Sequence, residues 1–173
     1  WALERPDFAE KLILLCSTWR AYVGNIANRA IQRTAILSNV TDHRGGLVVA
    51  RMHALLSYTS EEKIEKRFSS LEHGDLFSRN LEITNYLRGK SERFAQRYAA
   101  ECYLVFLDMM DRFDMTSKMK SLPNGDYPQL LVLSASSDRL FDLEQQIEMV
   151  KELRKTNWDV QHQTVNTING HDS

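Results

Sequence analysis

The sequence predicts an α/β protein with a parallel sheet that is interrupted by a large helical insertion. Two short apolar runs, Lys11–Thr18 and Gln129–Ser134, have the composition of strands buried on both faces of a parallel sheet. An amphipathic helix over Leu143–Arg154 then leads to an alternating strand over Trp158–Val165. Strand, helix and strand in this order are typical of a parallel sheet.

The segment between the first two strands has the spacing of helices. A helix is expected over Asn25–Leu37, and the most apolar helix over Leu47–Tyr58, after a turn and helix start at residues 41–46. Ser60 precedes two glutamates and is expected to cap a further helix.

The rest of this segment alternates between polar connections and helix. Leu71–Asn80 is expected to be a polar connection, Glu82–Met115 two helices, and Ser121–Pro128 a loop. The expected organisation is a sheet part over residues 1–20, a helical lid over 21–120, and a second sheet part over 121–173. The lid is expected above the carboxyl edge of the sheet, where sites of α/β proteins lie.

Composition excludes several classes of function. Apolar content of 43% and charged content of 26% are ordinary for a globular domain, and a net charge of −1 gives no reason to expect nucleic acid or an anionic membrane as partner. No apolar run approaches the ~18 residues of a membrane span. Cys16 and Cys102 stand in apolar contexts, which predicts buried thiols in a reducing compartment, the cytoplasm.

Two candidate catalytic residues follow strands. Asp138 comes directly after the second strand, and His171 follows Gly170 after the last one. A strand-end acid followed by a histidine is the order of the last two members of a Ser-Asp-His triad, in which the carboxylate holds one tautomer of the imidazole. Asp138 could instead be a helix cap or a turn acid before Leu143, and His171 could be a surface loop histidine. No Gly-x-Ser-x-Gly motif occurs in the chain, so the nucleophile is expected upstream of Trp1.

Arg51 places a permanent charge inside the most apolar helix. Tyr58 lies seven residues further on, which is close to two helical turns and therefore on nearly the same face. A buried guanidinium needs an anion, and a ligand carboxylate would serve. Snorkelling to the surface or a structural ion pair are the alternatives. The four other histidines show no metal-ligand spacing: His43, His53, His73 and His162.

Five collinear segments resemble the homoserine O-acetyltransferases, enzymes of methionine biosynthesis with the α/β-hydrolase fold. The segments cover nearly the whole chain: Ala50–Ser60, Asn85–Phe94, Tyr103–Asp114, Ser137–Gln146 and Gly170–Asp172. The resemblance implies a partial α/β-hydrolase fold, with C-terminal parallel strands and an inserted helical lid. It also implies a homodimer through that lid.

The resemblance implies acetyl transfer from acetyl-CoA, as co-substrate, to the hydroxyl of homoserine through an acyl-serine intermediate, with no bound cofactor. His171 would be the general base and Asp138 its orienting carboxylate. Arg51 would bind the homoserine carboxylate with Tyr58 nearby, and Asp172 would bind the amine.

Three alternatives stay open at this point. The acyl group could be succinyl, the acceptor could be serine, another alcohol or water in an esterase of the same fold, and the chain could be a truncated, non-catalytic product. A Gly-x-Ser-x-Gly motif shortly before Trp1 would favour an enzyme.

Overall fold

A computed structural model describes residues 2–38, 40–68, 76–122, 126–156 and 158–171, with only the backbone for residues 76–81. The chain forms two compact units, one from Trp1–Ala21 with Phe113–Ser173 and the other from Tyr22–Arg112. We call them the sheet unit and the helical unit. The sequence placed the boundaries after residues 20 and 120, and in the structure they follow residues 21 and 112.

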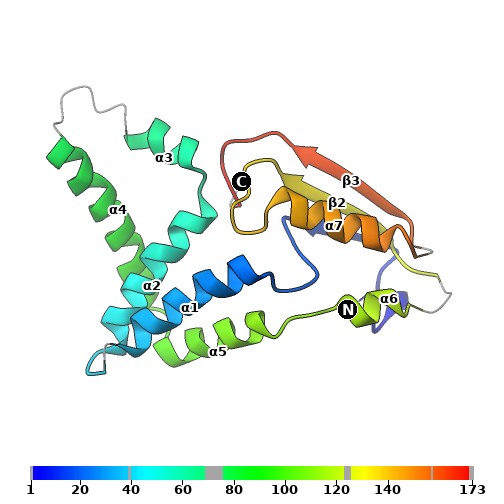
Figure 1. Cartoon of the computed structure of the whole chain (residues 1–173), viewed down its shortest axis with the longest axis horizontal. Helices are drawn as coiled ribbons and strands as arrows, with labels where there is room; N and C mark the ends of the chain where they lie inside the picture. Colours follow the sequence, from blue (N-terminus) through cyan, green and yellow to red (C-terminus); the bar gives the residue numbers. More distant parts are fainter. Residues whose placement is uncertain (1, 39, 69–75, 123–125, 157, 172–173) are drawn as a thin grey trace. The chain divides into compact units, whose positions relative to one another are not determined.

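Three parallel strands form the sheet in the order β1-β2-β3 (Figure 1). Their bounds are Lys11–Leu15, Gln129–Ala135 and Val160–Val165. Leu130 and Val132 lie on one face of the central strand β2 and are almost completely buried, whereas Leu131 and Leu133 on the opposite face are partly buried. The prediction of a parallel α/β sheet is confirmed. β1 and β3 lie within the runs that predicted them, and β2 extends one residue beyond its run, to Ala135.

The helix α7 connects β2 to β3 and spans Leu143–Leu153. It buries Met149, Val150 and Leu153, which recur at helical spacing on one side. The sheet unit also contains two short elements that the sequence did not reveal, a 3-10 helix over Pro6–Phe8 and α6 over Thr116–Lys120. Both are too short for a periodic pattern to show.

The two segments that connect the sheet unit to the helical unit lie side by side. Arg20 and Asp114 form an antiparallel bridge. The Ala21 N–H donates to the Phe113 carbonyl at 2.8 Å, and the Met115 N–H donates to the Trp19 carbonyl at 2.9 Å. The chain therefore leaves the sheet unit and returns to it at one place.

The helical unit consists of α1 to α5 (Figure 1). Their bounds are Val23–Leu37, His43–Tyr58, Glu61–Phe68, Leu76–Ala95 and Ala100–Asp111. The predicted order of helices is confirmed, including the division of Glu82–Met115 into two. Ser60 caps α3 as predicted, because its hydroxyl accepts the Lys63 N–H at 3.1 Å.

The helix α2 begins at His43, within residues 41–46, where a turn and helix start were predicted. It follows Asp42, whose carboxylate accepts the Arg44 N–H at 3.0 Å. One predicted boundary was wrong. Residues 76–80, expected to be a polar connection, are the first turns of α4. These five residues, Leu-Phe-Ser-Arg-Asn, contain neither glycine nor proline, so nothing in them opposes a helix. Residues 71–75 lie outside the described residues.

Gly46, near the start of α2, lies where this helix touches the backbone of α1. A Cβ atom at Gly46 would lie 2.5 Å from the Ala35 carbonyl oxygen and 2.6 Å from the Ile36 Cα. The backbones of α1 and α2 are therefore in direct contact at this point. Around it packs the core of the helical unit, whose buried members include Ile36, Leu47 and Leu107.

A partly buried ion-pair cluster joins α1 to α5. Arg29 Nε lies 2.5 Å from Asp111 Oδ1, and Arg33 Nη2 lies 2.6 Å from Asp111 Oδ2. Burial alone would raise the pKa of Asp111, but the hydrogen bonds and charges of the two arginines outweigh it and lower this pKa. The two arginines thus compensate the carboxylate on both oxygens.

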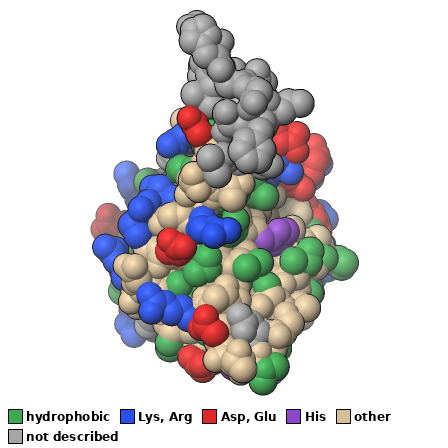
Figure 2. Space-filling view, turned by 90° about the vertical axis from the view of Figure 1, so that its left-hand side faces the viewer, with side chains coloured by type: hydrophobic (Ala, Val, Ile, Leu, Met, Phe, Trp, Pro, Cys, Tyr) green, Lys and Arg blue, Asp and Glu red, His purple; other side chains and the backbone are tan. Residues whose placement is uncertain are grey.

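On the face of the molecule shown in Figure 2, hydrophobic side chains lie between charged ones. In α5, Val105, Phe106 and Met109 are each more than half exposed. Within the described ranges, no helix is long and apolar enough to cross a membrane.

Candidate active site

Asp138 and His171 meet at the carboxyl edge of the sheet. His171 Nδ1 lies 3.0 Å from Asp138 Oδ2. The other oxygen, Asp138 Oδ1, accepts the backbone N–H groups of Leu140 at 2.8 Å and Phe141 at 2.9 Å. Asp138 is 5% exposed, so the carboxylate is both buried and fixed. It does not cap α7, because that helix begins after Asp142, but its bonds to Leu140 and Phe141 make it the turn acid that was the other alternative.

Two serines that precede Asp138 hold the loop that carries His171. Ser136 Oγ accepts the Thr167 N–H at 3.1 Å, and Ser137 Oγ accepts the Gly170 N–H at 3.0 Å. Gly170 has a φ of 82°, a conformation that glycine adopts without strain. The sequence Ser-Ser-Asp therefore supplies the acid and also anchors the segment that presents the histidine.

This geometry defines the chemistry that the pair can perform. A carboxylate can only accept hydrogen bonds, so the contact assigns the proton to Nδ1 and leaves Nε2 as the acceptor nitrogen of the neutral ring. The Phe141 ring lies edge-on to the imidazole, with 5.4 Å between centroids, and helps to fix its plane. The arrangement is that of a general base with an orienting acid.

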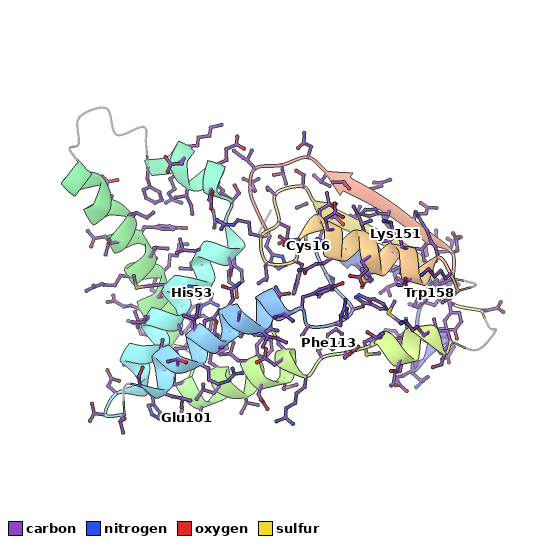
Figure 3. The ribbon with its side chains drawn as sticks, in the orientation of Figure 1. Cys16, His53, Glu101, Phe113, Lys151 and Trp158 are labelled. Atoms are coloured by element: carbon purple, nitrogen blue, oxygen red, sulfur yellow. The ribbon has the colours of Figure 1, made fainter. Side chains whose placement is uncertain are left out.

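Cys16 is a third group at this edge (Figure 3). The sequence analysis did not place it beside Asp138 and His171. It directly follows β1, has a φ of 44°, and donates its N–H to the Leu133 carbonyl at 2.8 Å. Its sulfur, a carboxylate oxygen of Asp138 and a ring nitrogen of His171 all lie within 4.8 Å of one another. Burial raises the pKa of the Cys16 thiol, and the charge of Asp138 adds to this rise.

The prediction for the two cysteines was half right. Cys16 is buried, but Cys102 is exposed, because its position on α5 faces away from the core of the helical unit. The proximity of Cys16 to Asp138 could have been inferred from its place at the end of a strand, since the carboxyl ends of parallel strands share one edge.

Arg51 lies among aromatic rings in the helical unit. Its Nη1 donates to the Tyr58 hydroxyl at 3.3 Å, so the two residues share a face as predicted. The guanidinium carbon lies 4.2 Å from the centroid of Phe94 and 5.9 Å from that of Tyr103. Burial opposes the charge, but the two tyrosine hydroxyls outweigh it and raise the Arg51 pKa.

Arg51 makes no ion pair with a carboxylate of the described residues, and its buried Nε has no hydrogen-bond partner among them. The alternative of a structural ion pair thus has no support in that part of the chain. Sequence reasoning missed Phe94 and Tyr103 as partners of the guanidinium. Asp172, expected to bind an amine, lies outside the described residues.

The structure thus pairs Asp138 with His171 in the sheet unit, and Arg51 with Tyr58 in the helical unit. Parallel strands with an inserted set of helices, and an acid and a histidine at the strand ends, define the class of α/β-hydrolase-fold proteins. No protein-family model matches the chain.

Curated relatives narrow this class. The chain is 28% identical to a homoserine O-acetyltransferase of Rhodospirillum rubrum, 30% identical to one of Zymomonas mobilis, and 28% identical to a homoserine O-succinyltransferase of Hydrogenovibrio crunogenus. Each match covers 100% of the chain and 49%, 52% and 50% of the relative, respectively. The chain spans about half the length of these relatives, and its resemblance to homoserine O-acyltransferases is confirmed.

Solved structures support the fold. A homoserine O-acetyltransferase from Bacillus anthracis superposes with a TM-score of 0.81 at 17% identity, over 99% of this chain and 50% of that one. An esterase superposes with a TM-score of 0.83 at 18% identity, over 99% of this chain and 52% of that one. The chain has a partial α/β-hydrolase fold, as predicted.

Proposed function

We propose that the protein transfers an acetyl group from acetyl-CoA to the γ-hydroxyl of homoserine through an acyl-serine intermediate. The observation that carries this proposal is the 3.0 Å contact between Asp138 Oδ2 and His171 Nδ1 at the carboxyl edge of the sheet. Whole-chain similarity to homoserine O-acyltransferases supports homoserine as the acceptor. The nucleophilic serine is expected in the part of those relatives that this chain does not span.

In the first half-reaction, His171 Nε2 accepts the proton of the serine hydroxyl as its oxygen attacks the thioester carbon. The tetrahedral intermediate then expels the thiol of CoA, which takes that proton from the imidazolium. Asp138 stabilises the imidazolium and keeps the ring oriented, because Oδ1 is already held by two backbone N–H groups. The products are acyl-serine and free CoA.

In the second half-reaction, the γ-hydroxyl of homoserine gives its proton to Nε2 and attacks the acyl carbon. Collapse of this intermediate returns the proton to the serine oxygen and releases the acylated homoserine. The same imidazole therefore serves as base and acid twice, and no net proton is consumed.

Arg51 is proposed to bind the homoserine carboxylate, and Asp172 its amine. Support comes from the partly buried guanidinium, which is held by aromatic rings and has an unpartnered Nε among the described residues. A planar guanidinium can hold a carboxylate with two parallel hydrogen bonds. Tyr58, which already accepts from Nη1, would fix the orientation of this group.

The decisive experiment separates the two half-reactions in the complete protein. Arg51→Ala is expected to raise the KM for homoserine by roughly 10- to 100-fold, the usual value of a charged hydrogen bond, and to leave acyl-enzyme formation from acetyl-CoA nearly unchanged. Arg44→Ala is the matched control, because Arg44 is an exposed arginine of the same helix. Equal loss in both half-reactions would assign Arg51 a structural role.

The same assay discriminates the alternatives. Release of CoA that depends on homoserine supports acyl transfer, and release at the same rate without homoserine indicates hydrolysis. The similarity to an esterase of known structure is the observation that favours hydrolysis. Comparing acetyl-CoA with succinyl-CoA decides the acyl donor, which relatives of both kinds leave open.

We also propose a homodimer formed through the helical unit. The exposed apolar side chains of α5 support it, since Val105, Phe106 and Met109 are 60%, 57% and 63% exposed and lie within little more than one turn. Sedimentation velocity of the complete protein measures the oligomeric state, and a monomer at micromolar concentration would contradict the proposal.

A further inference from the structure

Three side chains from three strand ends converge on one point of the sheet unit. Cys16 follows β1, Asp138 follows β2 and His171 follows β3, and one ligand atom from each lies within 4.8 Å of the other two. Cys16 and Asp138 are both 5% exposed, and the side chain of His171 is 22% exposed. Each is held by a fixed backbone, because strand pairing positions all three segments.

We propose that Cys16, Asp138 and His171 form a binding site for a thiophilic divalent ion, with Zn²⁺ as the reference ion. Thiolate, imidazole and carboxylate are the three donor types that proteins offer to zinc. Mg²⁺ and Ca²⁺ prefer oxygen ligands only, so a site with sulfur and nitrogen selects against them. Three protein ligands leave the fourth tetrahedral position for water.

The hydrogen bonds of the site indicate which atoms would bind the ion. Asp138 Oδ1 is engaged by the N–H groups of Leu140 and Phe141, which leaves Oδ2 as the ligand. His171 Nδ1 faces Oδ2 at 3.0 Å, so an ion between them would replace the proton that they now share. Cys16 completes the set from β1, where its N–H is bonded to Leu133.

Binding rearranges two protons. The thiol of Cys16 loses its proton to solvent, and the sulfur binds as thiolate. The Nδ1 proton moves to Nε2 of His171, so the imidazole stays neutral and one proton is released in total. With its proton on Nε2, the ring can no longer accept one from a nucleophile at that nitrogen. The ion therefore inhibits the enzyme, a consequence that rests on the proposed function, whereas the binding itself does not.

The first test is spectroscopic and independent of activity. Co²⁺ added to the complete, metal-free protein is expected to produce a thiolate-to-cobalt charge-transfer band in the near ultraviolet. Cys16→Ser should remove this band, and Cys102→Ser, which changes the other cysteine of the chain, should keep it. Absence of the band in the parent protein, or its survival in Cys16→Ser, would overturn the proposal.

A second measurement requires no variant and covers the case in which Cys16→Ser does not fold. X-ray absorption at the zinc edge should show one sulfur at about 2.3 Å together with nitrogen and oxygen ligands. A shell without sulfur would overturn the assignment of Cys16.

The inhibition is measured separately, with each variant compared to its own metal-free rate. Zn²⁺ should inhibit homoserine-dependent CoA release, a chelator should restore it, and Mg²⁺ should have no such effect. In Cys16→Ser the Zn²⁺ concentration for half-inhibition should rise at least about tenfold. A cobalt band without inhibition would leave the metal site standing and contradict the role proposed for His171.

Discussion

His171 Nδ1 lies 3.0 Å from Asp138 Oδ2, while Asp138 Oδ1 is held by the backbone of Leu140 and Phe141. The two oxygens of one carboxylate thus have separate tasks, since one fixes the loop and the other orients the imidazole. A change that affects only Oδ2 therefore separates the chemical role of Asp138 from its structural role.

Asp138→Asn is expected to make this separation. The asparagine oxygen can keep both backbone hydrogen bonds, but its amide N–H₂ faces Nδ1 and forces the proton of the ring onto Nε2. The kcat should fall by about 10³- to 10⁴-fold, as in other triads that hold the wrong tautomer. The melting temperature should change little. Asp142→Asn, an exposed neighbour, serves as control, and a kcat within tenfold of the parent would contradict the role of Asp138.

Asp111→Asn should destabilise the helical unit. The change leaves Arg29, a buried arginine, without its counter-charge, and removing one partner of a buried pair costs about 3–5 kcal/mol. Asp108→Asn in the same helix breaks only the exposed contact with Arg112 and should cost less than about 1 kcal/mol. Urea denaturation of both variants measures the difference. An equal loss of unfolding free energy in both variants would show that the Arg29–Asp111 pair stabilises the fold no more than the exposed Asp108–Arg112 pair does.

The same carboxylate predicts a pH dependence. The pKa of Asp111 is lowered in the folded state, so its contribution is fully present above the unfolded pKa of about 3.8 and is lost as the pH falls through the folded pKa. The free energy of unfolding of the parent should therefore decrease more steeply below pH ~4 than that of Asp111→Asn. Parallel curves for the two proteins would contradict this assignment.

Gly46→Ala should destabilise the contact between α1 and α2. The new methyl group would meet backbone atoms of Ala35 and Ile36 at 2.5 and 2.6 Å, which neither helix can relieve by turning a side chain. Overpacking of this kind costs about 1–3 kcal/mol. Gly89→Ala is the control, because its nearest contact is the flexible end of Arg93 at 3.8 Å, and it should stabilise α4 by up to ~1 kcal/mol. Thermal denaturation measures both changes, and melting temperatures that shift in the same direction for the two variants would contradict this prediction.

His162 should make the sheet unit sensitive to mild acid. Its Nε2 lies 2.9 Å from the Ser134 hydroxyl, and burial, with a contribution from Arg154, lowers its pKa below 6.5. The neutral ring therefore stabilises the fold above pH 6.5, and this contribution is lost as the pH falls through the lowered pKa. The difference in unfolding free energy between the parent and His162→Gln should shrink below pH 6.5, as measured by denaturant titration at several pH values.

The sequence predicted the features that depend on local pattern. Apolar runs revealed the strands, helical spacing revealed the helices, and strand-end positions brought out Asp138 and His171. The features it did not reveal depend on tertiary contact. A glycine is needed at position 46 of α2 because the backbone of α1 leaves no room there for a side chain. Cys16 lies beside Asp138 because β1 and β2 are neighbours in the sheet although they are far apart in the chain.

The aromatic surroundings of Arg51 belong to the same category. Its charge and its helix were evident from the sequence, and so was the shared face with Tyr58. Phe94 and Tyr103 come from two other helices, α4 and α5, and only the packing of the helical unit brings them to the guanidinium. No spacing rule within a single helix could have identified them.

The adjacency of the two connecting segments has a consequence for the order of folding. β1 and β2 pair directly, yet the whole helical unit separates them in sequence, and the entropy cost of closing a loop grows with its length. The contact of Arg29 with Asp111 joins the middle of α1 to the last residue of α5. Helices that assemble early through local contacts would therefore bring Trp19 and Met115 close together before β1 and β2 pair. We therefore expect the inserted helices to act as an internal template, with strand pairing after their assembly.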